Sequence, residues 1–288
     1  MTLCLIPESF AVIPPSPWDT PAVNNDIRAN VLYLPIAHDE VKAIKIRGSD
    51  EELVDLLKIN NPRIKPLGSF NTKYKNTYDG YSKVRLGVYK KLLKMLEFLP
   101  GHIGIAYFEG LRPLYKQKEY FDKIFKEILS KVHDKEIAYQ ETTKYVSPFI
   151  DNVPTHATGA AIDITLFSIK DKQAEMMDMG KFDVIFGPND QQETFSENTT
   201  IEQRKNRLIL FDAAAKAGLA SYGFEWWHYS YGDRMWAYVT KQKKLYMALL
   251  LQKMTLYYLL IKHHIYKALV ISNFRYNLGC VIISLLDY

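Results

Sequence analysis

Apolar residues recur every three or four positions in residues 82–97 and 114–132, which is the spacing of one helix face. We expect a helix over each of these segments and a third helix over residues 201–217. The last segment follows Thr200, a residue type that caps helix N-termini, and precedes Gly218, a residue type that ends helices. The pattern therefore predicts a substantial helical component.

Shorter segments alternate between apolar and other residues, as strands with one buried face do. Such alternation predicts strands at residues 103–110 and 160–167, and residues 30–37, "NVLYLPIA", form a third candidate. The segment "SDEELVDLLKI" predicts a further helix, which Ser49 opens and in which Glu52 completes a capping box. Helices and strands follow each other irregularly, which favours an α+β fold over a wound parallel sheet.

The N-terminal segment is rich in proline, and we expect residues 1–49 to form an extended segment and a strand ahead of a main domain at residues 50–245. No basic region precedes the apolar start, and prolines interrupt it, so we expect no signal peptide. Cys4 and Cys280 lie near opposite ends and are expected to be reduced thiols. These features together predict a cytoplasmic protein.

The net charge of +5 is concentrated at the C-terminal end. Residues 241–288 carry seven Lys or Arg and one acid, which leaves 30 basic and 31 acidic residues in the rest of the chain. The body therefore lacks the basic field that binds nucleic acid. Residues 246–288 form an apolar, basic tail whose apolar runs fall short of the ~20 residues of a membrane span. We interpret the tail as an appendage, with contact to a membrane surface as a minority alternative.

Two short stretches carry the candidate chemistry. The first, "THATGAAID", places His156 seven residues before Asp163, and the second, "EWWH", places Glu225 three residues before His228. A hydrolytic zinc ion needs three protein ligands, an open position for water and a base close to that water. Two imidazoles and two carboxylates supply these parts, provided that the fold brings the two stretches together.

Asp163 is the most informative of these residues, because it lies in an otherwise apolar strand. A buried carboxylate is unfavourable without a partner, and a bound cation would remove that penalty. Gly159 lacks a side chain that would obstruct a turn between His156 and the strand. Taken singly, each stretch also has an ordinary explanation as a loop pair or a piece of core, and Trp226 and Trp227 are expected to be core.

The sequence resembles the D-alanyl-D-alanine dipeptidases, which are zinc peptidases. The resemblance rests on "HATGAAID", on "EWWH" and on an upstream "EGLRPL" that contains Arg112, and it covers roughly residues 50–245. It implies an α+β domain of the DD-peptidase and Hedgehog type, with a small, mostly antiparallel central sheet flanked by helices. It also implies hydrolysis of a small dipeptide, D-alanyl-D-alanine, in cell-wall peptidoglycan metabolism.

The resemblance implies a role for each matched residue. His156, Asp163 and His228 would bind one zinc ion per chain. Glu225 would act as the catalytic base that moves a proton from water to the leaving amine, and Arg112 would stabilise the tetrahedral intermediate.

Two positions depart from the family pattern. Asp183, in "MGKFD", matches the family's amine-binding Asp with a spacing that differs by one residue. The family often has a Ser two residues before its first zinc-binding His, and this chain has Pro154 there. The role of that Ser would fall to Thr155, Thr158 or a backbone amide, or would be lost.

Two alternatives to the dipeptidase remain open from the sequence. The same zinc chemistry would serve a D,D- or L,D-carboxypeptidase that acts on longer muropeptides. The fold could also persist as a non-catalytic, zinc-stabilised binding protein, although a structural zinc ion would need neither Glu225 nor Arg112. The sequence sets no oligomeric state.

Overall fold

The computed structural model describes residues 16–19, 23, 25–46, 48–182 and 190–241. They belong to the first of two compact units of the chain, Met1–Ala248. The predictions for Asp183, for the tail at 246–288 and for the first fifteen residues lie outside the described residues. Within the described part of the chain, no helix is both long and apolar enough to span a bilayer.

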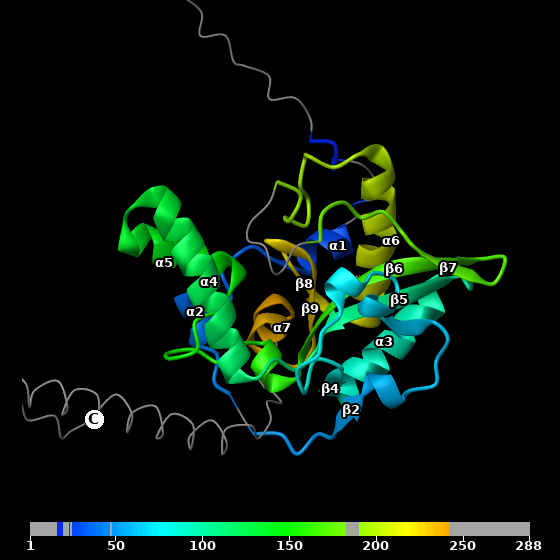
Figure 1. Cartoon of the computed structure of the whole chain (residues 1–288), viewed down its shortest axis with the longest axis horizontal. Helices are drawn as coiled ribbons and strands as arrows, with labels where there is room; N and C mark the ends of the chain where they lie inside the picture. Colours follow the sequence, from blue (N-terminus) through cyan, green and yellow to red (C-terminus); the bar gives the residue numbers. More distant parts are fainter. Residues whose placement is uncertain (1–15, 20–22, 24, 47, 183–189, 242–288) are drawn as a thin grey trace, which may run out of the picture. The chain divides into compact units, whose positions relative to one another are not determined.

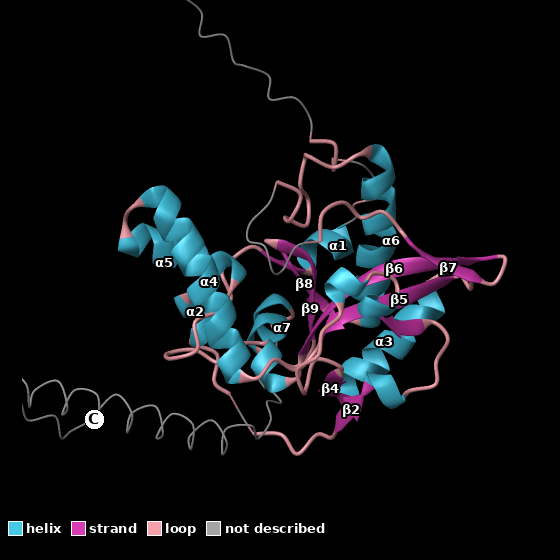
Figure 2. Cartoon of the chain, in the orientation of Figure 1, coloured by secondary structure: helices cyan, strands magenta, loops and turns pink. Residues whose placement is uncertain are grey.

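The centre of the unit is a sheet that, in the described residues, contains seven strands (Figure 2). Its neighbours in order are β1, β8, β9, β6, β5 and β3, and β7 pairs with β6. The pairs β1–β8 and β3–β5 are parallel, and the others are antiparallel. The strands are β1 Val31–Leu32, β3 Ile64–Pro66, β5 Ile103–Glu109, β6 Ala161–Lys170, β7 Gln173–Met176, β8 Ala220–Tyr222 and β9 Glu225–Ser230.

A second, two-stranded sheet pairs β2, Leu53–Asp55, with β4, Lys83–Arg85. The α-helices are α1 Asn25–Ala29, α2 Asp39–Lys42, α3 Leu86–Phe98, α4 Leu114–Val132, α5 Lys135–Tyr145, α6 Ile201–Ala217 and α7 Arg234–Val239. Short 3-10 turns are η1 Leu56–Lys58, η2 Leu67–Ser69, η3 Thr72–Tyr74 and η4 His156–Thr158.

The longer helices form two groups, one that packs on the main sheet and one that forms a separate hairpin (Figure 1). Helices α3 and α6 contact each other and bury Leu92, Met95 and Leu210 in the main core with β5, β6 and β9. Helices α4 and α5 form a hairpin with a small core of its own, which includes Phe121 and Ile128. The mixed sheet with its helices confirms the predicted α+β fold and the mostly antiparallel sheet.

The strongly periodic segments are confirmed. Helix α4 has the predicted bounds, and α6 begins at a capping box between Thr200 and Gln203 and ends at Gly218, whose φ of 82° is left-handed. Helix α3 begins later than predicted, because the residues before it form β4. The strands at 103–110 and 160–167 are β5 and β6, whereas the candidate at 30–37 is reduced to the two residues of β1. Helix α5 was not predicted.

The helix predicted from Ser49 is wrong. The Ser49 hydroxyl accepts a hydrogen bond from the Glu51 amide, but the chain then extends as β2 and turns through η1. The Glu51 carboxylate accepts instead from the amide of Gly87, 2.5 Å away at the start of α3. The partner that stabilises the extended form is β4, about thirty residues along the chain, so a local capping pattern could not reveal it.

Candidate active site

Asp163 and His228 meet because they are register partners on the neighbouring strands β6 and β9. The Oδ1 atom of Asp163 lies 3.1 Å from Nδ1 of His228. Asp163 is fully buried and His228 almost so. Residues that lie opposite each other on paired strands have their Cβ atoms about 5 Å apart, so the sheet itself fixes this pair.

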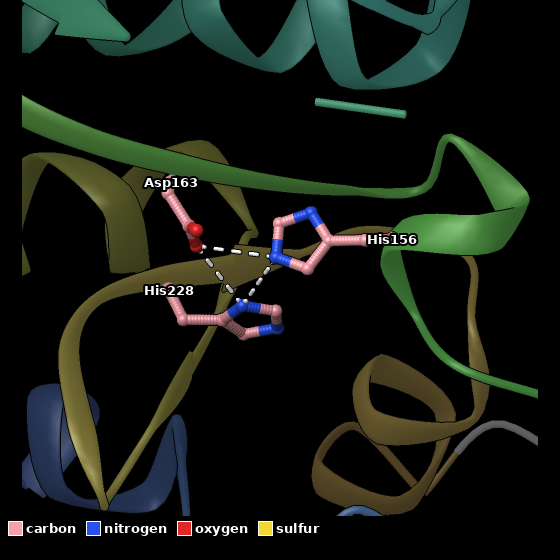
Figure 3. Close-up of side chains that lie close together, drawn as sticks. All are labelled: His156, Asp163 and His228. Atoms are coloured by element: carbon pink, nitrogen blue, oxygen red, sulfur yellow. Dashed lines mark hydrogen bonds and ion pairs between the residues drawn. The ribbon is translucent and has the colours of Figure 1, made fainter. Parts of the chain in front are cut away.

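His156 reaches the same point from the turn η4, which precedes β6 (Figure 3). Its Nε2 atom lies 3.0 Å from Nδ1 of His228 and 3.2 Å from Oδ1 of Asp163. Gly159 ends the turn with a φ of 69°, a left-handed conformation that glycine adopts without strain. The turn sends the chain into β6, which returns it to the cluster at Asp163.

The three donor atoms fit a divalent metal ion. Ligand atoms 2.0–2.1 Å from a tetrahedral zinc ion lie roughly 3.3 Å apart, close to the three distances between these side chains. The second oxygen of Asp163, Oδ2, is buried and has no hydrogen-bond partner among the described residues. A buried carboxylate with an unmatched oxygen beside two imidazole nitrogens lacks positive charge, which a metal ion would provide.

The protonation states suit metal binding. Burial alone would raise the pKa of Asp163, but His156 and His228 hold that pKa below its usual range, so the carboxyl is ionised. Burial lowers the pKa of His228, so its imidazole is neutral at neutral pH. An ionised carboxylate and neutral imidazoles are the forms that ligate metals.

The outer nitrogen of each histidine also has a partner. Nδ1 of His156 lies 2.8 Å from the carbonyl oxygen of Gly110, which can only accept, so the ring donates there and leaves the lone pair of Nε2 free. Nε2 of His228 lies 3.4 Å from the hydroxyl of Thr155. Such outer contacts orient metal-binding imidazoles.

Glu225 opens β9 and lines the same pocket as His156 and His228. Side chains three apart on a regular strand point to opposite faces. The register between β8 and β9 shifts, from Ser221 opposite Tyr229 to Tyr222 opposite Glu225, and this irregularity allows Glu225 and His228 to face one pocket. Burial, reinforced by the charge of Asp163, raises the pKa of the Glu225 carboxyl well above its usual range.

Arg112 also lines the pocket, from the loop between β5 and α4, and is almost fully buried. Its Nε donates to Glu109 at 2.9 Å, its Nη2 donates to the other oxygen of Glu109, and its Nη1 donates to Gln117 at 3.1 Å. The guanidinium also lies 4.9 Å from the ring centre of Tyr120. Within the described residues, these hydrogen bonds use three of its five N–H groups.

Sequence patterns did not single out Glu109, although a signal was present. It ends the apolar strand β5, is fully buried and stands three residues before Arg112. The reasoning that marked Asp163, a carboxylate in an apolar strand that requires a cation, applies equally to Glu109. Its register partner across the sheet is Asp163 itself, so the two buried acids lie side by side.

The pocket lies between the sheet and the α4–α5 hairpin. Pro154 and Thr155 both line it, whereas Thr158 does not, because the Thr158 hydroxyl donates to the Thr155 carbonyl and accepts from the Ala160 amide. Trp226 and Trp227 are buried core residues, as expected, and do not line the pocket. The full lining is Ile36, Arg112, Gln117, Tyr145, Ser147, Pro154, Thr155, His156, Glu225 and His228.

Comparisons with known proteins identify relatives of this chain. The family described as D-ala-D-ala dipeptidase, within the peptidase group M15, matches residues 130–246. A D-alanyl-D-alanine dipeptidase of Synechocystis sp. is 30% identical over 194 residues, which cover 58% of this chain and 76% of that protein.

Two solved structures are more distant. A Zn(II) complex of a mutant of the vancomycin-resistance D,D-pentapeptidase VanY has a TM-score of 0.35 and 14% identity, over 60% of this chain and 87% of that one. The LD-carboxypeptidase LdcB also has a TM-score of 0.35, with 18% identity over 69% and 76% of the two chains.

The fold and the buried His–Asp–His cluster are those of a metallopeptidase. The extent of the match to the Synechocystis protein makes the assignment more specific: the chain belongs to the D-alanyl-D-alanine dipeptidase family. The predicted family is therefore confirmed.

Proposed function

We propose that the protein is a zinc-dependent dipeptidase that hydrolyses D-alanyl-D-alanine in cell-wall peptide metabolism, with one zinc ion per chain. The observation that carries the proposal is the buried cluster of His156, Asp163 and His228, whose ligand atoms all lie within 4.8 Å of one another. Glu225 and Arg112 line the pocket into which this cluster faces. Family membership supplies the substrate, and a cytoplasmic location remains a prediction from the sequence.

Zinc bound by these residues would lower the pKa of a water molecule towards ~7 and so make a nucleophile available near neutral pH. Glu225 is the base in this proposal. In the metal-free site, burial raises the pKa of its carboxyl, so the ionised carboxylate would be a stronger base than an exposed one when it takes a proton from water and returns it to the leaving amine. Its buried position also keeps bulk water away from that proton.

Arg112 is the proposed electrophile. Its charge is fixed in place by Glu109 before substrate arrives, so no reorganisation is needed when negative charge develops on the peptide oxygen. The proposal assigns the substrate's free amine to Asp183, as the family resemblance implies. Hydrolysis thus needs a metal, a base and a cation, and the pocket brings candidates for all three together.

The test is to replace Glu225 with Gln in the full-length protein. We expect zinc content to stay at the wild-type level while hydrolysis of D-alanyl-D-alanine falls by about 10²–10⁴-fold, the usual contribution of a general base. Glu175→Gln, at an exposed position on β7, is the matched control and should retain full activity. Hydrolysis at the wild-type rate in the Glu225 variant would show that Glu225 is not the catalytic base.

The substrate assignment has its own test. Purified wild-type protein with zinc should cleave the free dipeptide and release D-alanine. Cleavage of longer muropeptides without cleavage of the dipeptide would make the protein a carboxypeptidase. Zinc binding without any peptide cleavage would make it a binding protein.

A further inference from the structure

Strand β4 joins the two loops that carry the proposed catalytic groups. On one side, the amide of Gly110 donates to the carbonyl of Tyr81 at 2.6 Å, and the amide of Leu111 donates to Lys83 at 2.7 Å. On the other side, the amide of Arg85 donates to the carbonyl of Gly159 at 2.9 Å. The loop before Arg112 and the turn after His156 therefore both form backbone hydrogen bonds with β4 or with the residues just before it.

The contact with the first loop is close. A Cβ atom on Gly110 would lie 2.4 Å from the carbonyl oxygen of Lys83, so only glycine fits there. The Gly110 carbonyl is the atom that accepts from Nδ1 of His156. The amide of Arg112 in turn donates to the carbonyl of His156 at 3.1 Å. β4 thus sets the distance between two loops that also contact each other.

The side chain of Arg85 reinforces the second contact. Its Nη2 donates to the carbonyl of Thr158 at 2.6 Å, so Arg85 binds two consecutive carbonyls of the turn η4 and its end. Arg85 is 2% exposed. From the β2 side, the side chain of Leu53 would come within 2.9 Å of a Cβ atom on Gly159. The turn that carries His156 therefore packs against the β2–β4 sheet.

Arg85 differs from the other fully buried arginine of the described residues, Arg207. Arg207 donates to three carbonyls, those of Met179, Glu193 and Gln191, at 2.7, 2.9 and 2.7 Å. Nε and Nη1 of Arg85 have no hydrogen-bond partner among the described residues, and the nearest Glu51 oxygen is 3.9 Å from Nη1. A buried cation with unmatched donors contributes little to the stability of the fold. Its presence at this position therefore needs a reason other than stability.

We propose that Arg85 is a positioning residue for the metal site. Its guanidinium holds the carbonyl of Thr158, next to the backbone bond from its amide to Gly159, and so fixes the turn that places Nε2 of His156 beside His228 and Asp163. The role rests on the proposed function, because the cluster must bind a metal for its geometry to matter. Residues that hold ligands without touching the metal typically contribute 10–100-fold to metal affinity.

The test compares Arg85→Met with Arg207→Met, which removes an equally buried guanidinium from a segment that bears no proposed ligand. The probe is zinc alone, and its dissociation constant is measured by chelator competition, beside the melting temperature of the metal-free protein. We expect Arg85→Met to weaken zinc binding about 10–100-fold. Arg207→Met should lower the melting temperature and leave zinc affinity unchanged. Arg85→Lys, which keeps a donor for Thr158, should recover most of the affinity.

Three outcomes would overturn the role of Arg85: wild-type zinc affinity in Arg85→Met, an equal loss of affinity in Arg207→Met, or no recovery in Arg85→Lys. Should Arg85→Met fail to fold, Arg85→Leu replaces it, and wild-type zinc affinity in that shorter variant, which also lacks a side-chain donor, would have the same meaning. A wild-type protein that binds no zinc would instead contradict the proposed function.

Discussion

Two groups of buried ionisable residues meet at the pocket, and they differ in how fully their charges and hydrogen bonds are matched. We call them the Asp163 side, with His156 and His228, and the Arg112 side, with Glu109 and Gln117. On the side of Asp163, two imidazole nitrogens and a carboxylate oxygen lie about 3 Å from one another, and Oδ2 of the carboxylate is unmatched among the described residues. On the side of Arg112, a carboxylate, an amide and an aromatic ring surround the guanidinium. Both sides are desolvated to a similar degree.

The difference indicates what each side needs in order to work. The Asp163 side lacks a positive charge at its centre, so it is complete only when a cation is bound. The Arg112 side already pairs its cation with Glu109, so it is organised before any metal or substrate arrives. Removal of a group from the first side should therefore change metal binding, and removal from the second should change turnover alone.

The largest expected effect is that of Asp163→Asn. The amide keeps the shape of the carboxylate and removes the charge, so zinc affinity should fall by more than the roughly 10–100-fold typical of residues around the ligands. Hydrolysis should fall with it. Chelator competition and metal analysis measure the loss. A variant that binds zinc like the wild type would contradict the view that this side of the pocket lacks a cation.

Glu109→Gln should disturb the Arg112 side and lower kcat without a change in zinc affinity. Arg112 would keep its charge but lose its ionic partner, and misplacing one such donor typically lowers kcat by about 10²–10³-fold. Zinc affinity should stay at the wild-type level. In an Arg112→Lys background the same change should cause little further loss, because the two residues act as a unit. Additive losses of kcat in the two variants, or a loss of bound zinc, would show that Glu109 does not act by positioning Arg112.

Glu225, a buried carboxyl in the same pocket, should make the stability of the protein depend on pH. Burial raises its pKa in the folded protein, so the folded state favours the protonated carboxyl. This contribution to stability is fully present below the unfolded pKa of about 4.3 and is lost as the pH rises through the folded pKa. In metal-free protein, Glu225→Gln should therefore melt above the wild type at neutral pH and approach it in acid. The exposed Glu175→Gln variant should follow the wild type at every pH, and a gap that did not change with pH would argue against the buried charge.

Much of the Asp163 side could be predicted from the sequence, because its signals are local. An acid in an apolar strand and a glycine at a turn are each visible within about ten residues. The Arg112 side was predicted less completely. Its arginine came from the family resemblance, whereas Glu109 carried the same local signal as Asp163 and was not used.

The parts that could not be predicted depend on how strands pair. The segment after Ser49 has a helical capping pattern, yet it forms β2 because β4 pairs with it. The spacing of Glu225 and His228 gives no hint that an irregular register turns both towards one pocket. In the first case a contact with a remote strand outweighs a local preference, and in the second an irregularity in the pairing of two neighbouring strands sets the direction of the side chains.

The smallest expected effect concerns two neighbouring hydroxyls, those of Thr155 and Thr158. When Nδ1 of His228 is a ligand, Nε2 carries the proton and donates to Thr155, so Thr155→Val should weaken zinc binding by roughly 2–10-fold, the value of one hydrogen bond. Thr158→Val removes bonds to the Thr155 carbonyl and the Ala160 amide, which should lower the free energy of unfolding by about 1–3 kcal/mol. Chelator competition and thermal melting on both variants separate the two roles. The reverse pattern would mean that Thr155 supports the turn and that Thr158 is the hydroxyl coupled to His228.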